Sequence, residues 1–125
     1  MQYAILIHID EPSWDKLSLA ERKRIEAETN VLVADLTESG KLKGAAILQG
    51  GFTARTLTRK PGGFHVTDGP FAETKEILAG FQIVECDTIE EATAIAQRFP
   101  GLQLGFTLEI RPLADSCSTL RTRAE

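Results

Sequence analysis

The hydrophobic pattern begins with a strand-length run and continues with a helix-length periodic segment. Residues 1–9 are almost continuously apolar, which predicts a buried first strand. Residues 19–39 carry apolar side chains at helical spacing, so they predict a helix of about five turns. Ser18 and Glu21 form a capping box before it, and Gly40 suits its left-handed end. The buried face of this helix is expected to hold Ile25, Leu32 and Leu36.

The middle of the chain predicts a second strand followed by a hairpin. Residues 43–48 form a short apolar strand that ends before Gly50 and Gly51. Residues 53–67 alternate between apolar and polar side chains on either side of a turn at residues 60–63. We therefore expect a β-hairpin here, inserted between two strands of the main sheet.

The last third of the chain predicts a strand, a short helix and a final strand. Residues 77–86 form another long apolar strand, and residues 104–110 form the last one. Thr88 and Glu91 supply a second capping box, for a helix that stops at residues 100–101. The buried stripe of this helix is expected to be Ala92, Ile95, Ala96 and Phe99.

The order of these elements matches the split βαβ pattern of a ferredoxin-like α+β sandwich with an inserted β-hairpin. That fold has an antiparallel sheet in strand order 4-1-3-2, with both helices on one face. The other face is uncovered, and an uncovered apolar face is a surface for a partner. We expect a homodimer, with two copies paired through this open sheet face as a dimeric α+β barrel with two-fold symmetry. The alternative is a monomer whose open face is polar.

Length, composition and charge narrow the class of protein. The 125 residues, 42% of them hydrophobic, predict one domain over residues 1–113 and a flexible polar tail over residues 114–125. Cys86 and Cys117 lack ligand-like spacing and no signal sequence is present, which favours a reduced, cytoplasmic protein. No apolar run approaches the roughly 20 residues needed to cross a membrane. A net charge of −4 without a basic stripe argues against a nucleic-acid partner, so we expect a small-molecule ligand.

The candidate chemistry gathers at residues 68–76. Asp68 begins an Asp-Gly-Pro turn, and Glu73 and Lys75 follow before the next strand. Alternation along the first strand places His8 on the face away from the helices, at the end where this loop joins an antiparallel neighbour. Because a histidine beside a carboxylate is the usual general acid–base pair, His8 and Asp68 are the candidate catalytic residues.

Other side chains are candidates for substrate binding. Lys75 can neutralise an anionic substrate, and Glu73 and Trp14 can line the same pocket. Each candidate also has a structural interpretation, in which Lys75 is a surface charge and Trp14 covers the start of the helix. In that interpretation His8 is a hydrogen-bonded strand residue, and Asp68 caps the donors of its own turn.

No metal and no cofactor are expected. The two histidines, His8 and His65, lack carboxylate partners at any familiar ligand spacing. No Walker loop is present, and the glycine pairs at residues 50–51 and 62–63 fit a bulge or a hairpin better than a phosphate site.

Residues 66–76, Val-Thr-Asp-Gly-Pro-Phe-Ala-Glu-Thr-Lys-Glu, resemble the signature of the DGPF group of YCII-related proteins. Residues 3–7, 18–22 and 108–113 are also similar to that family, so the resemblance spans residues 1 to about 113. It implies the dimeric α+β barrel fold. It also implies a small bacterial cytoplasmic protein whose activity is unassigned.

The resemblance also bears on the site. Some YCII-related proteins are proposed to be enzymes with a His and Asp pair in a cavity at the dimer partner, and Asp68 matches the signature aspartate. The histidine of that pair lies, in those relatives, in the region of residues 18–23, which contain none here. That His8 takes its place is our own inference from the fold. Related modules are also joined to sigma-factor-like regions.

Two functions are therefore expected. The first is a homodimer that binds a small polar or anionic metabolite beside residues 68–76, with acid–base catalysis as an open question. The second is a non-catalytic ligand-sensing or interaction module associated with sigma-factor-type transcription regulation.

Overall fold

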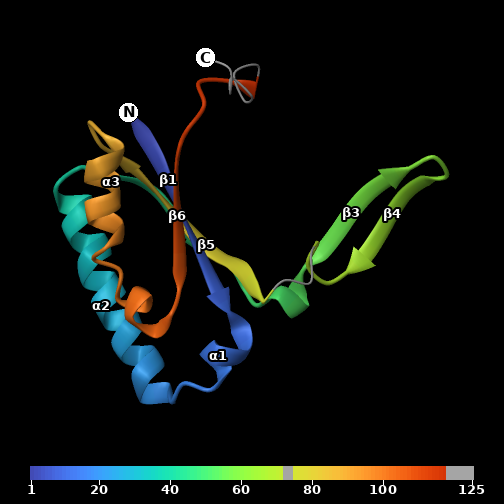
Figure 1. Ribbon diagram of the computed structural model, residues 1–125, viewed down its shortest axis with the longest axis horizontal. Helices are drawn as coiled ribbons and strands as arrows, with labels where there is room; N and C mark the ends of the chain where they lie inside the picture. Colours follow the sequence, from blue (N-terminus) through green and yellow to red (C-terminus); the bar gives the residue numbers. More distant parts are fainter. Residues whose placement is uncertain (72–74, 118–125) are drawn as a thin grey trace.

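A computed structural model of the chain describes residues 1–71 and 75–117 (Figure 1). Its main sheet has four strands in the spatial order β2-β5-β1-β6, and every neighbouring pair is antiparallel. Counting only these strands along the chain, the order is 4-1-3-2, so the predicted ferredoxin-like topology is confirmed. The strands are β1 (Gln2–Asp10), β2 (Leu42–Ile47), β5 (Glu76–Glu85) and β6 (Thr107–Pro112).

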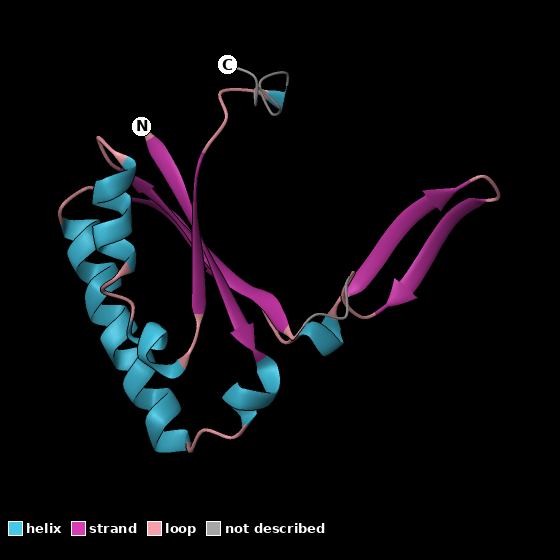
Figure 2. Cartoon of the chain, viewed as in Figure 1, coloured by secondary structure: helices cyan, strands magenta, loops and turns pink. Residues whose placement is uncertain are grey.

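Two helices, α2 (Leu19–Glu38) and α3 (Ile89–Ala96), cover one face of this sheet (Figure 2). The predicted capping box of α2 is present. The Glu21 backbone N–H donates to Ser18 Oγ at 3.1 Å, and the Ser18 N–H donates to Glu21 Oε1 at 3.1 Å. The Ser18 N–H and the Ser18 hydroxyl both donate to the Glu21 carboxylate, and these two hydrogen bonds lower the pKa of the carboxyl. Gly40 follows the helix with a φ of 76°, as expected for its left-handed end.

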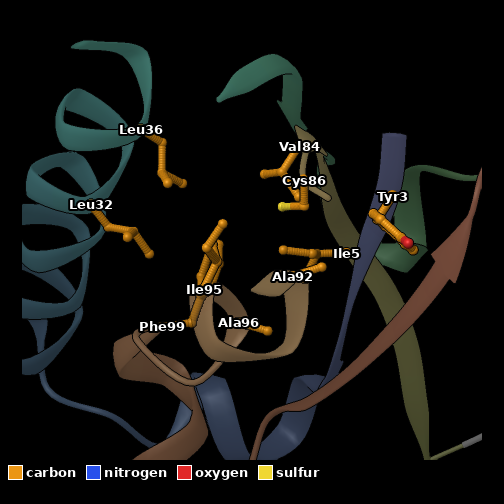
Figure 3. Close-up of a cluster of buried hydrophobic side chains, with 10 residues drawn as sticks. All are labelled: Tyr3, Ile5, Leu32, Leu36, Val84, Cys86, Ala92, Ile95, Ala96 and Phe99. Carbon is orange, nitrogen blue, oxygen red and sulfur yellow. The ribbon is translucent and has the colours of Figure 1, made fainter. Parts of the chain in front are cut away.

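The core lies between the helices and the sheet (Figure 3). The stripe expected on α2 and the one expected on α3 are both buried, which confirms the two helix faces. Tyr3 and Ile5 of β1 meet them from the sheet, as the alternation along that strand predicted. The cluster is completed by Leu32, Leu36, Val84, Cys86, Ala92, Ile95, Ala96 and Phe99.

The capping box predicted at the start of α3 is only half formed. Thr88 Oγ1 accepts from the Glu91 N–H at 3.2 Å, as expected of an N-cap. The Glu91 carboxylate, however, accepts from the Asp87 N–H at 3.0 Å and pairs with the Lys41 ammonium. The second half of the prediction is therefore wrong, because a cation outside the helix holds the carboxylate.

Among residues 1–71 and 75–117, three short helices lie at element boundaries that were predicted to be loop or strand. They are α1 (Glu11–Asp15), η1 (Gly51–Thr53) and η2 (Pro100–Leu104). The α3 helix also ends at Ala96 rather than at residues 100–101. Phe99 has extended backbone angles, because the proline ring that follows disfavours a helical conformation at the preceding residue.

The inserted hairpin is confirmed and forms a separate two-stranded sheet. Strand β3 (Arg55–Lys60) pairs with β4 (Gly63–Asp68) and, among the described residues, with no strand of the main sheet. Figure 1 shows it projecting from the body on the side away from α2 and α3. We call residues 55–68 the arm.

In the part of the chain that the structure describes, no helix lies over the second face of the main sheet (Figure 2). Leu6 of β1 pairs in register with Phe81 of β5, and Ala4 pairs with Ile83. Because neighbouring side chains alternate, these four point away from the core. The centre of this open sheet face is therefore apolar, and Glu109 and Arg111 of β6 lie at its side.

Candidate functional site

A cavity of about 620 Å³, which we call the larger cavity, lies between the first half of α2 and the sheet. It is on the helix side of the sheet, next to the core and away from the open sheet face. Its apolar floor comes from both central strands. The residues of this floor are Ile7, Ile9, Ile77 and Ala79.

A β-bulge in β5 shapes this floor. Ile7 is paired with Gly80, but the next residue, His8, is paired with Leu78, so Ala79 is skipped in the register with β1. The extra residue reverses the alternation at the start of β5. As a result Ile77 shares the cavity face with Ile9, while Leu78 lies beside His8 on the open sheet face.

Aromatic side chains and a cation close one end of the larger cavity. The rings of Trp14 and Phe106 lie 5.8 Å apart between centroids, tilted by 56°. The Arg22 guanidinium lies 5.8 Å from the centroid of the Trp14 ring, and its Nη2 donates to the Asp15 carbonyl at 3.0 Å. These contacts hold Arg22 against the cavity wall.

The rim of the larger cavity is polar and carries both positively and negatively charged side chains. Arg22, Lys23, Glu26 and Asn30 of α2 reach it from one side, and Gln49 reaches it from the segment after β2. An apolar floor beneath a polar rim suits a small molecule with a flat apolar body and polar substituents.

A smaller cavity, about 240 Å³, lies on the other side of the Trp14 and Phe106 pair. Its lining is more polar and includes Asp10, Ser13 and Lys75. The Lys75 ammonium lies 3.6 Å from Asp10 Oδ2. The structure therefore brings together two predicted substrate-binding residues, Trp14 and Lys75, in one lining.

His8 lies on the open sheet face, as predicted. Its Nε2 is 3.7 Å from Glu109 Oε1 of the neighbouring strand β6. Among residues 1–71 and 75–117, no hydrogen bond or ion pair joins His8 to Asp68. The carboxylate beside His8 is thus one that the sequence analysis did not consider.

Asp68 ends β4 at the base of the arm, and its side chain is 88% exposed. Its Oδ1 lies 3.5 Å from Arg55 Nε, and the turn itself is held by a hydrogen bond from the Gly69 N–H to the Ala54 carbonyl at 2.8 Å. Glu73, the other predicted substrate-binding residue, lies outside the described residues. Catalysis by His8 and Asp68 stays a prediction.

Sequence reasoning missed Arg22, Phe106 and Glu109. A signal for Arg22 was available, because it precedes Ile25 by three residues and so shares the buried face of α2. Phe106 follows an unpredicted 3₁₀ helix, and Gly105 between them has a φ of 88°. Nothing local in the sequence indicates that turn.

Within the described ranges, no group of three or more His, Cys, Asp and Glu side chains is arranged to hold a metal ion. The helices of these ranges are also too short or too polar for any of them to span a bilayer.

Comparison with known proteins gives a family and a fold. The family model of the YCII-related domain matches residues 1–114. An uncharacterised protein of Rhizobium meliloti (strain 1021) is 36% identical over 115 residues, which cover 91% of this chain and 93% of that protein.

A solved structure shares the architecture at low sequence identity. It is 5-chloro-2-hydroxyhydroquinone dehydrochlorinase of Burkholderia phenoliruptrix AC1100, in complex with 2,5-dihydroxybenzoquinone. It superposes with a TM-score of 0.56 at 14% identity, over 93% of this chain and 96% of that one. The likeness confirms the predicted fold class, the α+β fold of the dimeric barrel proteins.

Proposed function

This chain belongs to the family of YCII-related domains, and on that premise we propose that it binds a small cyclic organic molecule in the larger cavity. The observation that carries the proposal is the cavity itself, with its floor of aliphatic side chains and its polar rim. A volume of about 620 Å³ lies within the usual range for sites that enclose a small ligand.

The aromatic side chains in the wall of the larger cavity favour a ligand that contains a flat ring. Trp14 and Phe106 offer aromatic surfaces, on which a flat ligand can stack with its ring offset or tilted. The dehydrochlorinase with the same fold holds a hydroxylated six-membered quinone, which supports a ligand of that size and kind. Arg22 and Lys23 on the rim favour substituents that carry negative charge or oxygen acceptors.

This proposal changes the ligand expected from the sequence. The sequence predicts a polar or anionic metabolite in a dimer cavity beside residues 68–76. The larger cavity instead favours a molecule with an apolar body, in which only the substituents are polar. Lys75 and the smaller cavity lie next to it, across the Trp14 and Phe106 pair, and can take an anionic substituent.

The proposed assembly is a homodimer through the open sheet face. Leu6, Phe81 and Ile83 give that face an apolar centre, which a second copy can cover by the same contacts on both sides of a two-fold axis. His8 and Glu109 then lie at the interface between the two sheets.

Trp14 makes the ligand proposal directly testable, since it is the only tryptophan of the chain and lines the cavity. Titration with 2,5-dihydroxybenzoquinone is expected to quench its fluorescence in a saturable manner. Thr29→Phe fills part of the cavity and should weaken binding about tenfold or more, the equivalent of about 1.4 kcal/mol. Ala27→Phe adds the same ring on the exposed side of α2 and should leave binding unchanged.

The two variants make the result decisive. Quenching that rises linearly and equally in wild type, Thr29→Phe and Ala27→Phe is collisional, and it would rule out the cavity as a site for this ring. A panel of benzoates and phenolates, measured in the same way, then ranks the substituents.

The regulatory function expected from the family resemblance stays a prediction. It requires a stable complex with a sigma-factor-type regulator encoded beside this protein. Co-purification of the two, with and without the quinone, tests it. A neighbourhood of metabolic genes without a regulator would count against it.

A further inference from the structure

The arm carries an apolar face that, among the described residues, no other helix or strand covers, although the Arg59 guanidinium lies 5.4 Å from the centroid of the Phe64 ring. Leu57 and Val66 are directly paired across its two strands, and Phe64 pairs with Arg59 on the same face. Their exposed fractions are 63% for Leu57, 70% for Phe64 and 60% for Val66. The other face is polar, with Thr56, Thr58, His65 and Thr67. The arm is therefore amphipathic, a pattern that belongs to a strand pair with one face buried.

Hydrogen bonds close the base of the arm and anchor the segment before it to the body. The Thr56 hydroxyl donates to the Gly69 carbonyl at 2.8 Å, and the Gly51 N–H donates to Glu11 Oε2 at 2.9 Å. Gly51 is buried so tightly that a Cβ there would lie 2.9 Å from Glu11 Oε1. The segment that leads into the arm is thus anchored to α1, whereas the arm itself is a two-stranded hairpin, which in isolation has only marginal stability in water.

The net charge of the arm indicates which kind of surface it can contact. Residues 55–68 contain two arginines, one lysine and one aspartate, a net charge of +2, whereas the chain as a whole has −4. The remainder of the chain therefore carries −6. The rest of a second copy is therefore net acidic and complements the net basic arm, and a second copy is present wherever the protein itself is present.

We infer that the arm lies across a second copy of this chain, with Leu57, Phe64 and Val66 against the partner's body. The inference rests on the homodimer proposed above. The arm projects on the side of the open sheet face, so a copy seated on that face lies within its direction (Figure 1). Two-fold symmetry gives each copy one arm from its partner, and the apolar faces of both arms are covered.

Sedimentation velocity of the full chain, from about 1 to 100 μM, tests the arm with two matched substitutions. Leu57→Asp and Thr58→Asp each add one negative charge to adjacent positions of β3, on opposite faces. We expect Leu57→Asp to weaken the dimer about tenfold or more, and Thr58→Asp to change it less than about twofold. Circular dichroism checks the fold, and Leu57→Ser serves if Leu57→Asp does not fold.

A third variant separates the arm from the dimer. Phe81→Asp places a charge on the open sheet face and should dissociate the dimer. If Phe81→Asp dissociates it while Leu57→Asp behaves as wild type, the arm inference is wrong and the dimer stands. A wild type that stays at about 14 kDa throughout overturns both, given the chain mass of 13.7 kDa. Quenching of Trp14 by the quinone in Leu57→Asp reports on the cavity independently.

Discussion

Lys41, immediately before β2, forms an ion pair with Glu91 in the first turn of α3. The pair links the β1-α2-β2 half of the fold to the β5-α3-β6 half. Hydrogen bonding to Lys41, and to the Asp87 N–H, lowers the pKa of the Glu91 carboxyl. The same contact raises the pKa of the Lys41 ammonium. The two halves are thus joined by a charge pair as well as by the core.

Stability should depend on pH through this pair. A carboxyl whose pKa is lowered by folding stabilises the protein above its unfolded value, about 4.3, and loses that effect as the pH falls through the folded value. A lysine whose pKa is raised stabilises below about 10.4 and loses the effect at higher pH. We expect Glu91→Gln to lower the urea midpoint at pH 7 and to make little difference at pH 3.

The control for this measurement is Glu90→Gln. Glu90 occupies the same first turn of α3, and among the described residues it forms no ion pair. The Glu90→Gln substitution should shift the urea midpoint less than Glu91→Gln does at pH 7. Equal shifts in the two variants would assign the effect to the helix dipole instead of the pair.

Leu36→Ala should destabilise the fold strongly. Leu36 is 2% exposed in the core, and removal of a buried leucine side chain generally costs about 2–5 kcal/mol of unfolding free energy. Val31→Ala, at a 69% exposed position of the same helix, should cost less than about 0.5 kcal/mol. Urea unfolding of both variants measures the difference, and similar costs would contradict the packing described for α2.

Gly80→Ala should be harmful for a steric reason. A Cβ at Gly80 would lie 2.7 Å from the carbonyl oxygen of Ala46 on β2, so the strands must separate locally. We expect a loss of about 1–3 kcal/mol in stability and weaker quenching by the quinone, because Gly80 also lines the larger cavity.

Gly62→Ala is the matched change in the turn of the arm, where a Cβ meets no atom within 4 Å. It should alter stability by less than about 1 kcal/mol. If Gly80→Ala proves equally neutral, β2 does not approach β5 as closely as described.

The two cysteines should react very differently with thiol reagents. Cys86 is buried, and burial, reinforced by the Glu91 carboxylate, raises the pKa of its thiol. Cys117 is exposed. At pH 7.5 a disulfide reagent such as dithionitrobenzoate should modify one thiol quickly, and the second only after urea is added. In Cys117→Ser the fast phase should vanish, and a fast phase that persists would show Cys86 to be accessible.

Acid–base catalysis by His8 can be tested together with two candidate carboxylate partners, Glu109 and Asp68. If a metabolite screen yields turnover, His8→Ala should lower kcat by about 10²–10⁴-fold, as for the loss of a general base. Comparison of Glu109→Gln with Asp68→Asn then tells which carboxylate supports the imidazole. Turnover that survives all three substitutions removes this group of residues from the mechanism.

The sequence predicted the fold well because local and long-range signals agreed. Ser18 and Gly40 mark the ends of α2, and the apolar stripes predicted for both helices are buried. The predicted ends of helices were wrong where a single residue stops a helix although the helical spacing of apolar residues continues. Pro100 ends the helical conformation before Phe99, although Phe99 belongs to the apolar stripe and is buried.

The site was less predictable, because it depends on which strands become neighbours and in which register. His8 was placed correctly on its face, yet its neighbour Glu109 belongs to β6, and no local pattern pairs the two. The cavity was missed because it forms where the first half of α2 diverges from the sheet. Periodicity shows which side of a helix is apolar, but it does not show how closely that side packs.

The bulge at Ala79 has an evolutionary consequence. Deletion of Ala79 would remove the bulge but leave Ile77 opposite Ile9 on the floor of the larger cavity. If Ala79 were instead paired with His8 in a regular ladder, Leu78 would come opposite Ile9 and replace Ile77 on that floor. The pairing from Gly80 to Glu85, which holds the core, would stay as it is. A one-residue change of register at this position thus offers descendants of the fold a way to exchange ligands while they inherit the same core.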